Sequence, residues 1–220
     1  MPRREHTTSQ SYIDWLKSLG CVFYVPLDYE NGLKDLISGT TGSIVTGSSI
    51  TWDANENAYL VKKAGSGYCG IEWHSLNMNL YSDPNEILSF TYLMEHKTTK
   101  GRGNNCAQTM YPCFYNRGYT INVGSSSHYL SLNTWYKRAS SNHCDGSFGT
   151  KLYCDGILDV SISRAITRWS ALTTPQLGVE WQNMGPWTTD YNNHWAYLKN
   201  FMIFNRNLSQ DEIKQIQQIP

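Results

Sequence analysis

The sequence alternates along most of its length between short apolar runs and clusters of turn-forming residues. The apolar runs are separated by stretches rich in glycine, serine, threonine and asparagine. Asp155-Gly156, which lies between two of the apolar runs, is a dipeptide typical of a two-residue hairpin turn. Many short strands joined by turns predict an all-β sandwich of two antiparallel sheets. The strand candidates are CVFYVPLD (21–28), AYLVKKA (58–64), ILSFTYLMEHK (87–97), YTINVG (119–124), KLYCDGILDVSIS (151–163) and TPQLGVEW (174–181).

The closing segment begins with a strand candidate, YLKNFMIF (197–204), that is apolar on both alternating faces. Tyr197, Phe201 and Ile203 fall on one parity, whereas Leu198, Met202 and Phe204 fall on the other. A strand with apolar residues on both parities is expected to be buried on both faces. We therefore expect this strand to lie inside the sandwich.

A short helix is predicted directly after this strand. Ser209 suits the N-cap position, and Glu212, three residues later, completes a capping box. Leu208 and Ile213 stand at the positions of a hydrophobic staple. We expect this helix to pack back onto the sandwich and close the domain.

The first twenty residues differ in character from the rest of the chain. Residues 1–10 are polar, whereas Tyr12, Ile13, Leu16 and Leu19 recur at helical spacing before Gly20, a suitable residue to end a helix. We expect 1–20 to form an arm and a short helix that serve attachment to a partner. Residues 21–220 would then form the domain itself.

Composition excludes several classes of function. The chain has 220 residues and no net charge, which suits one domain and argues against binding nucleic acid through bulk charge. No uncharged apolar run approaches membrane-spanning length, so membrane insertion is not expected. The N-terminus also lacks the apolar region of a secretory signal.

Six cysteines are spread along the chain without a metal-binding pattern. There is no C-x-x-C pair, and the adjacent His143-Cys144 has no partners at zinc-site spacing. Without a signal peptide, we expect mostly reduced thiols that pack as small apolar groups. The cysteines are Cys21, Cys69, Cys106, Cys113, Cys144 and Cys154.

Several of these motifs together resemble laminin G-like domains of the concanavalin A-like lectin/glucanase class. FYVPLDYENGLKDLISGTTG (23–42) is similar to the opening of that family, with Asp35, Ser38 and Gly39 in its turn, and KLYCDG (151–156) is similar to its tyrosine–aspartate–glycine hairpin. PQLGVE (175–180) and the closing segment match two further family strands, the latter through Leu208, Ser209, Glu212 and Ile213. The resemblance covers about residues 21–219. It implies a jelly-roll sandwich, one of whose sheets is curved, with loops at its rims and short helices at both ends.

The sequence offers no catalytic site and no strong metal site. Glucanases of this fold use an E-x-D-x-x-E strand, and nothing here matches it, so we expect no enzyme and no catalytic residues. No other cofactor motif is present. Calcium would suit loop aspartates, but the sequence has no D-x-D-x-D cluster, and ordinary turn roles explain these residues better. The loop aspartates are Asp28, Asp53, Asp145 and Asp190.

One loop combines aromatic and amide side chains, EWQNMGPWTTDYNNHW (180–195). Tyrosine and tryptophan, 15 and 8 residues, far outnumber the 6 phenylalanines, and such amphipathic rings suit wet contact surfaces as well as the edges of a core. Aromatic faces stack on sugar rings, and amides and carboxylates bind hydroxyls. We predict that this loop forms the main contact surface, for a glycan or for a neighbouring subunit, although Trp181 and Trp195 also suit core packing. The predicted ligand-binding residues are Trp181, Asn183, Trp187, Asp190, Tyr191, Asn192 and Asn193.

Two hypotheses about function follow from the sequence. The first is a non-catalytic recognition or adhesion module that binds carbohydrate, displayed on a phage particle. The second is a structural decoration or fibre protein of a virion, whose partners are neighbouring capsid or tail subunits, and a homo-oligomer is compatible with either. Without a signal, the virion surface or the cytoplasm is the expected location. A glycoside hydrolase is the remote alternative.

Overall fold

The computed structural model describes residues 8–44, 48–63, 71–73, 89–100, 112–116, 119–120, 131, 133–144, 148–164, 176–179 and 195–219. The described elements are mostly strands, with one short helix near each end of the chain. They are α1 (Gln10–Ser18), β1 (Cys21–Val25), β2 (Ser43–Ile44), β3 (Ser48–Asp53), β4 (Ala58–Lys63), β5 (Ile71–Glu72), β6 (Ser89–Lys100), β7 (Pro112–Asn116), β8 (Tyr119–Thr120), β9 (Trp135–Cys144), β10 (Phe148–Cys154), β11 (Ile157–Arg164), β12 (Gln176–Val179), β13 (Trp195–Phe204) and α2 (Gln210–Gln218). The predicted all-β class with two short terminal helices is confirmed.

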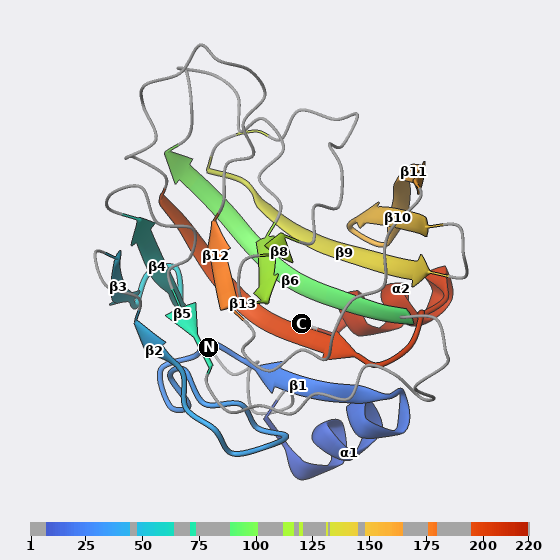
Figure 1. Cartoon of the computed structure of the whole chain (residues 1–220). Helices are drawn as coiled ribbons and strands as arrows, with labels where there is room; N and C mark the ends of the chain where they lie inside the picture. The colour runs from blue at the N-terminus through green and yellow to red at the C-terminus, as the bar shows by residue number, and fades with distance from the viewer. Residues whose placement is uncertain are drawn as a thin grey trace.

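A large antiparallel sheet forms the centre of the molecule (Figure 1). Its strands follow the order β11-β10-β9-β6-β13-β4-β3, and β1 also pairs with β13. The first half of β13 pairs with β4 and its second half with β1, while β6 lies along its other edge. The closing strand is therefore central, as the sequence predicts.

A smaller antiparallel sheet, β2-β5-β12-β7-β8, covers one face of the large sheet (Figure 1). Between the two lies the inner core, where Ile71 and Trp73 of the smaller layer pack with large-sheet residues such as Phe90, Phe201 and Ile203. Phe23 and Trp73 meet edge to face, with ring centroids 5.2 Å apart. Burial of these aromatic side chains makes this core the main source of stability.

The opposite face of the large sheet carries a second core, the outer core, beneath both helices. Tyr12, Ile13 and Leu16 of α1 are buried, and Tyr12 and Leu16 pack in this core together with Leu93 and Met202 of the sheet. The apolar stripe of α1 is thus covered by the domain itself. The expectation that a partner covers the apolar stripe of α1 is therefore wrong, because the domain's own outer core covers it. Residues 1–7 lie outside the described part of the chain.

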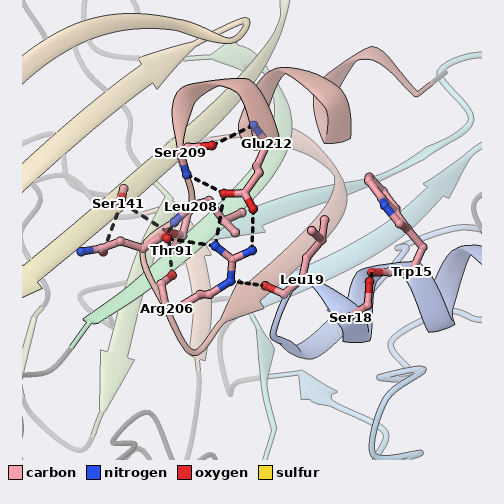
Figure 2. A network of polar contacts seen from close by, with 10 residues as sticks. Trp15, Ser18, Leu19, Thr91, Ser141, Arg206, Leu208, Ser209 and Glu212 are labelled. Carbon is pink, nitrogen blue, oxygen red and sulfur yellow. Dashed lines mark hydrogen bonds and ion pairs between the residues drawn. The ribbon is translucent and has the colours of Figure 1, made fainter.

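Helix α2 begins with the predicted capping box (Figure 2). The Ser209 hydroxyl accepts the Glu212 amide at 3.3 Å, and the Glu212 carboxylate accepts the Ser209 amide at 2.8 Å. Arg206 binds the same carboxylate through both terminal nitrogens, at 2.6 and 3.2 Å, and its Nε donates to the Leu19 carbonyl at the end of α1. Arg206 therefore links the two helices, and the staple residues Leu208 and Ile213 are both buried.

A β-bulge in β13 changes which residues face each core. Lys199 pairs with Glu95 and Met202 with Leu93, so β13 carries one extra residue at this point. Asn200 lies at φ +51°, in the left-handed region that asparagine tolerates. As a result Leu198 and Phe201 share the inner core, whereas Met202 lies in the outer core. Both faces are buried as predicted, but the strict alternation predicted from the sequence is wrong across the bulge.

The turn after β1 is built around a buried carboxylate. Asp35 is fully buried, and its oxygens accept the amides of Tyr24 at 2.8 Å, Ile37 at 3.0 Å and Ser38 at 3.0 Å, as well as the Ser38 hydroxyl. These hydrogen bonds satisfy the oxygens of the buried side chain and so offset the loss of its contacts with water. Asp35 therefore fixes the path of the chain that leads out of β1.

Candidate functional site

The predicted binding loop reaches the described structure only at its end. Trp195 is the first residue of β13, where its backbone pairs with Lys62 of β4 and Lys100 of β6. The predicted ligand-binding residues Trp181, Asn183, Trp187, Asp190, Tyr191, Asn192 and Asn193 lie outside the described residues. That site remains a prediction.

The most exposed large aromatic side chain of the described residues is Tyr29, which is 72% exposed. It lies in the loop after β1, and its ring packs against Trp52 of β3 with centroids 5.6 Å apart. Trp52 in turn meets Tyr59 of β4 edge to face, at 5.1 Å. Trp52 and Tyr59 lie opposite one another in the β3–β4 pair, and Tyr59 packs against the inner core. We call Tyr29, Trp52 and Tyr59 the aromatic platform.

Hydrogen bonds within the loop fix the position of Tyr29. The Asn31 amide donates to the Asp28 carboxylate at 2.7 Å, and the Gly32 amide donates to the Asp28 carbonyl at 2.9 Å. Gly32 has φ +58°, and a methyl group placed on it would lie 3.7 Å from the Tyr59 hydroxyl. Leu27, directly before the loop, is a buried non-glycine residue at φ +56°. A bulky residue rarely adopts that conformation, and such strain is found preferentially at binding sites.

The far end of the loop is anchored in the inner core. The Leu33 carbonyl accepts the Trp73 indole N–H at 2.7 Å and the Gly42 amide at 3.0 Å. A Cβ atom on Gly42 would come within 2.7 Å of the Trp73 ring, so only glycine permits this contact. The loop is thus held at its start by the buried Leu27 and at its end by the hydrogen bond that the buried Trp73 donates to Leu33. A preorganised aromatic surface loses little entropy when a ligand binds.

Acidic groups adjoin the platform. Asp28 and Glu30 flank Tyr29 in sequence, and the Asn31 side-chain amide donates to both Asp28 oxygens at 3.0 Å. Burial raises the pKa of Tyr59, and the negative charge of Asp28 and the neighbouring Tyr29 raise it further. Asp28 is also placed near the rings by its backbone, because its carbonyl accepts the amide of Gly32, which lies beside the Tyr59 hydroxyl. The site therefore offers ring faces, hydroxyls and carboxylate oxygens together.

A second aromatic cluster lies on the outer face of the large sheet. Tyr197, Lys97 and Trp135 lie side by side across β13, β6 and β9. The turn between β3 and β4 contacts them through its two carboxylates. Asp53 accepts the Tyr197 hydroxyl at 2.6 Å, and Glu56 accepts the Trp135 indole N–H at 3.2 Å.

Two lysines complete this cluster. Lys97 pairs with Glu56 at 2.5 Å, and the Lys199 ammonium lies 4.1 Å from the centroid of the Trp135 ring. The hydrogen bond from Lys97 lowers the pKa of Glu56, and the bond from Tyr197 lowers that of Asp53. The bond to Asp53 raises the pKa of Tyr197 to about 12. Each of these groups already has a partner within the protein, so we interpret the cluster as a fastening of the β3–β4 turn.

The residues that the structure describes form no metal site, either at the loop aspartates or elsewhere. Of the four loop aspartates, Asp28 and Asp53 accept protein N–H or O–H groups, whereas Asp145 and Asp190 lie outside the described residues. Among the residues that the structure describes, no group of three histidine, cysteine or carboxylate side chains could hold an ion. Cys21 and Cys154, the cysteines whose side chains are described, are both free. Burial raises the pKa of Cys21 to about 12, so it is not a nucleophile.

The aromatic platform was not predicted from the sequence. The segment YENG (29–32) reads as a turn, and a tyrosine in such a turn gives a weak signal for an exposed contact residue. Its partners Trp52 and Tyr59 lie more than twenty residues away, and only strand pairing brings them together.

Comparisons with known proteins support the fold. No family model matches the sequence, and no curated protein is significantly similar to it. Similar solved structures are receptor-binding domains of botulinum neurotoxins. The type G domain has a TM-score of 0.57 at 17% identity and covers 91% of this chain, and a serotype D/C domain has a TM-score of 0.60 at 16% identity and covers 90%. This chain spans about half of each, 51% in both cases. A type C neurotoxin structure has a TM-score of 0.59 at 15% identity, with 92% of this chain and 52% of its own length covered. Cell entry of that neurotoxin depends on interaction with two ganglioside molecules.

Proposed function

We propose that this domain is a non-catalytic recognition module that binds carbohydrate at the aromatic platform. The observation that carries the proposal is Tyr29, whose ring is largely exposed yet fixed in place by Trp52 and by the hydrogen-bonded loop. Electron-rich ring faces stack on the C–H faces of pyranose sugars, while carboxylates and hydroxyls accept and donate hydrogen bonds at the sugar edge. The laminin G-like resemblance and the ganglioside dependence of the similar type C neurotoxin both agree with this proposal.

Two substitutions at Tyr29 test it. Tyr29→Ala should weaken glycan binding by about 2 kcal/mol, roughly thirtyfold, the usual effect of truncating an aromatic anchor. Tyr29→Phe keeps the stacking face and should stay within a few-fold of the original affinity. A glycan array selects the ligand and isothermal titration measures affinity, with melting curves to verify folding. Unchanged binding by folded Tyr29→Ala would refute the assignment of the site.

The 180–195 loop remains part of the proposal as a second contact surface. Its composition supports stacking, and its end joins the large sheet at Trp195. The double variant Trp187→Ala, Tyr191→Ala belongs in the same titration. If it loses binding while Tyr29→Ala does not, the loop rather than the platform is the main glycan site.

An assembly role on a phage or other virus particle is the second candidate. It is favoured by β11, an edge strand of the large sheet that exposes Ile157 (67%) and Leu158 (43%). Exposed apolar residues on an edge strand favour pairing with another chain. Sedimentation analysis of the protein and of Ile157→Lys, Leu158→Lys tests self-association, and particle-incorporation assays test hetero-assembly. If the protein is monomeric and is not incorporated into particles, recognition remains as its proposed role.

None of the described helices is long and apolar enough to cross a membrane.

A further inference from the structure

We infer that the aromatic platform prefers a sugar that carries a free ammonium group, such as a glucosamine polymer, over neutral and acidic sugars. This inference rests on the proposed glycan function and names the ligand class of the same site. It follows from the carboxylates that the loop places beside the rings and from the positions of the lysines, two of which belong to the outer-face cluster.

The platform offers mainly acceptors. Asp28 directly precedes Tyr29, and its carbonyl accepts the amide of Gly32, which lies beside the Tyr59 hydroxyl. Glu30 is exposed directly after Tyr29. The Asn31 side-chain amide is turned toward Asp28, and its nitrogen donates to both carboxylate oxygens. A ligand at Tyr29 therefore meets carboxylate oxygens and electron-rich ring faces, and both attract a cation.

Among the lysines whose side chains the structure describes, Lys97, Lys199 and Lys34 do not neutralise this arrangement. Lys97 and Lys199 belong to the outer-face cluster, where they bind the Glu56 carboxylate and the Glu56 carbonyl, respectively. Tyr59, by contrast, packs against the inner core on the other side of the sheet. In the loop itself Lys34 is exposed, which leaves the segment Asp28–Lys34 with two carboxylates and one ammonium. An acidic sugar would face like charges there, whereas an ammonium would gain an ion pair and a cation–π contact.

Two oligosaccharides of equal length isolate this charge. At mildly acidic pH, a glucosamine oligomer carries free ammonium groups, and the N-acetylglucosamine oligomer is its neutral counterpart. The free-amine oligomer should bind about five- to tenfold more tightly, the effect of one exposed ion pair and one cation–π contact. A galacturonate oligomer, the acidic probe, should bind more weakly than both.

Two loop variants with opposite charge changes serve as matched controls. Glu30→Gln should bring the affinity ratio of the two oligomers toward one, whereas Lys34→Gln should preserve or increase it. Equal or tighter binding of the acetylated oligomer overturns this inference while the glycan function stands. The inference is also overturned if Glu30→Gln leaves the affinity ratio of the two oligomers unchanged, or if both variants reduce this ratio equally. If no oligosaccharide binds the folded protein, the proposed glycan function fails as well.

Discussion

Acid should destabilise this domain through a single buried histidine, His96. Its side chain lies on the inner face of β6 between Leu198 of β13 and Tyr136 of β9, and only 3% of the residue is exposed. Its Nε2 has no hydrogen-bond partner among the residues that the structure describes. Burial lowers the pKa of His96 from 6.5 to about 3, and the nearby charge of Arg138 adds to the effect. The folded protein therefore keeps His96 neutral where the unfolded chain takes up a proton.

The sign and size of the effect follow from this difference. Because the unfolded state binds the extra proton, the free energy of unfolding falls as the pH drops below 6.5, by about 1.36 kcal/mol per pH unit. The unfolded imidazole is already half protonated at pH 6.5, so the two units from pH 6.5 to 4.5 correspond to a loss of about 2.3 kcal/mol, a large share of the roughly 5–15 kcal/mol typical of a domain. Glu212, whose pKa the Arg206 hydrogen bond lowers to about 2, loses its contribution only below its ordinary pKa of 4.5. Between pH 6.5 and 4.5 the change in stability therefore comes from His96 rather than from Glu212.

Urea denaturation of the original protein and of His96→Met across this window measures the effect. Methionine has a similar volume and does not titrate, so the variant should lose about 2–3 kcal/mol less stability between pH 6.5 and 4.5. Other titrating groups are common to both proteins and cancel in the comparison. Parallel stability curves for the two proteins would refute the reasoning, because His96 would then be protonated in the fold or not buried.

The closing helix supports two further predictions. Ser209→Ala removes the N-cap and should lower the free energy of unfolding by about 1 kcal/mol in chemical denaturation, and an unchanged midpoint would contradict the role of the cap. Arg206→Met removes both the fork on Glu212 and the bond to the Leu19 carbonyl. NMR titration should then show the pKa of Glu212 rising from about 2 toward 4.5, and Arg206→Lys should restore only part of the shift.

Local chemistry was the part of the fold that the sequence predicted well. The capping box at Ser209, the Asp155-Gly156 turn and Gly20 after α1 involve residues a few positions apart, and all three are confirmed, with Asp155, Gly156 and Gly20 at φ +51°, +77° and +86°. Such features depend on backbone conformation within a few residues. Tertiary packing changes them little.

Strand β9 was missed because its sequence is polar. Trp135–Cys144 reads WYKRASSNHC, with no apolar alternation to mark a strand. Yet Arg138, Ser140 and Ser141 are buried there, between β6 and β10. The backbone of a central strand is satisfied by its neighbours whatever its side chains are, so strand pairing overrode the local pattern. The bulge at Asn200 escaped prediction for the same reason, since only the register with β6 reveals the extra residue.

The arrangement of the two cores leaves the rim of the sandwich as the place for the proposed recognition site. The inner core occupies the space between the sheets, and the helices cover part of the outer face, so buried apolar side chains fill both. The loop that carries Tyr29 is tied to these cores at both ends. Its start is held where the Pro26 carbonyl accepts the amide of Asn200, the bulge residue of β13, at 2.9 Å, and its end is held at the Leu33 carbonyl by Trp73. The irregularity that breaks the alternation of the central strand thus also supplies an anchor for the platform. A change at Asn200 should therefore affect both core packing and the position of Tyr29, although the two residues are far apart in sequence.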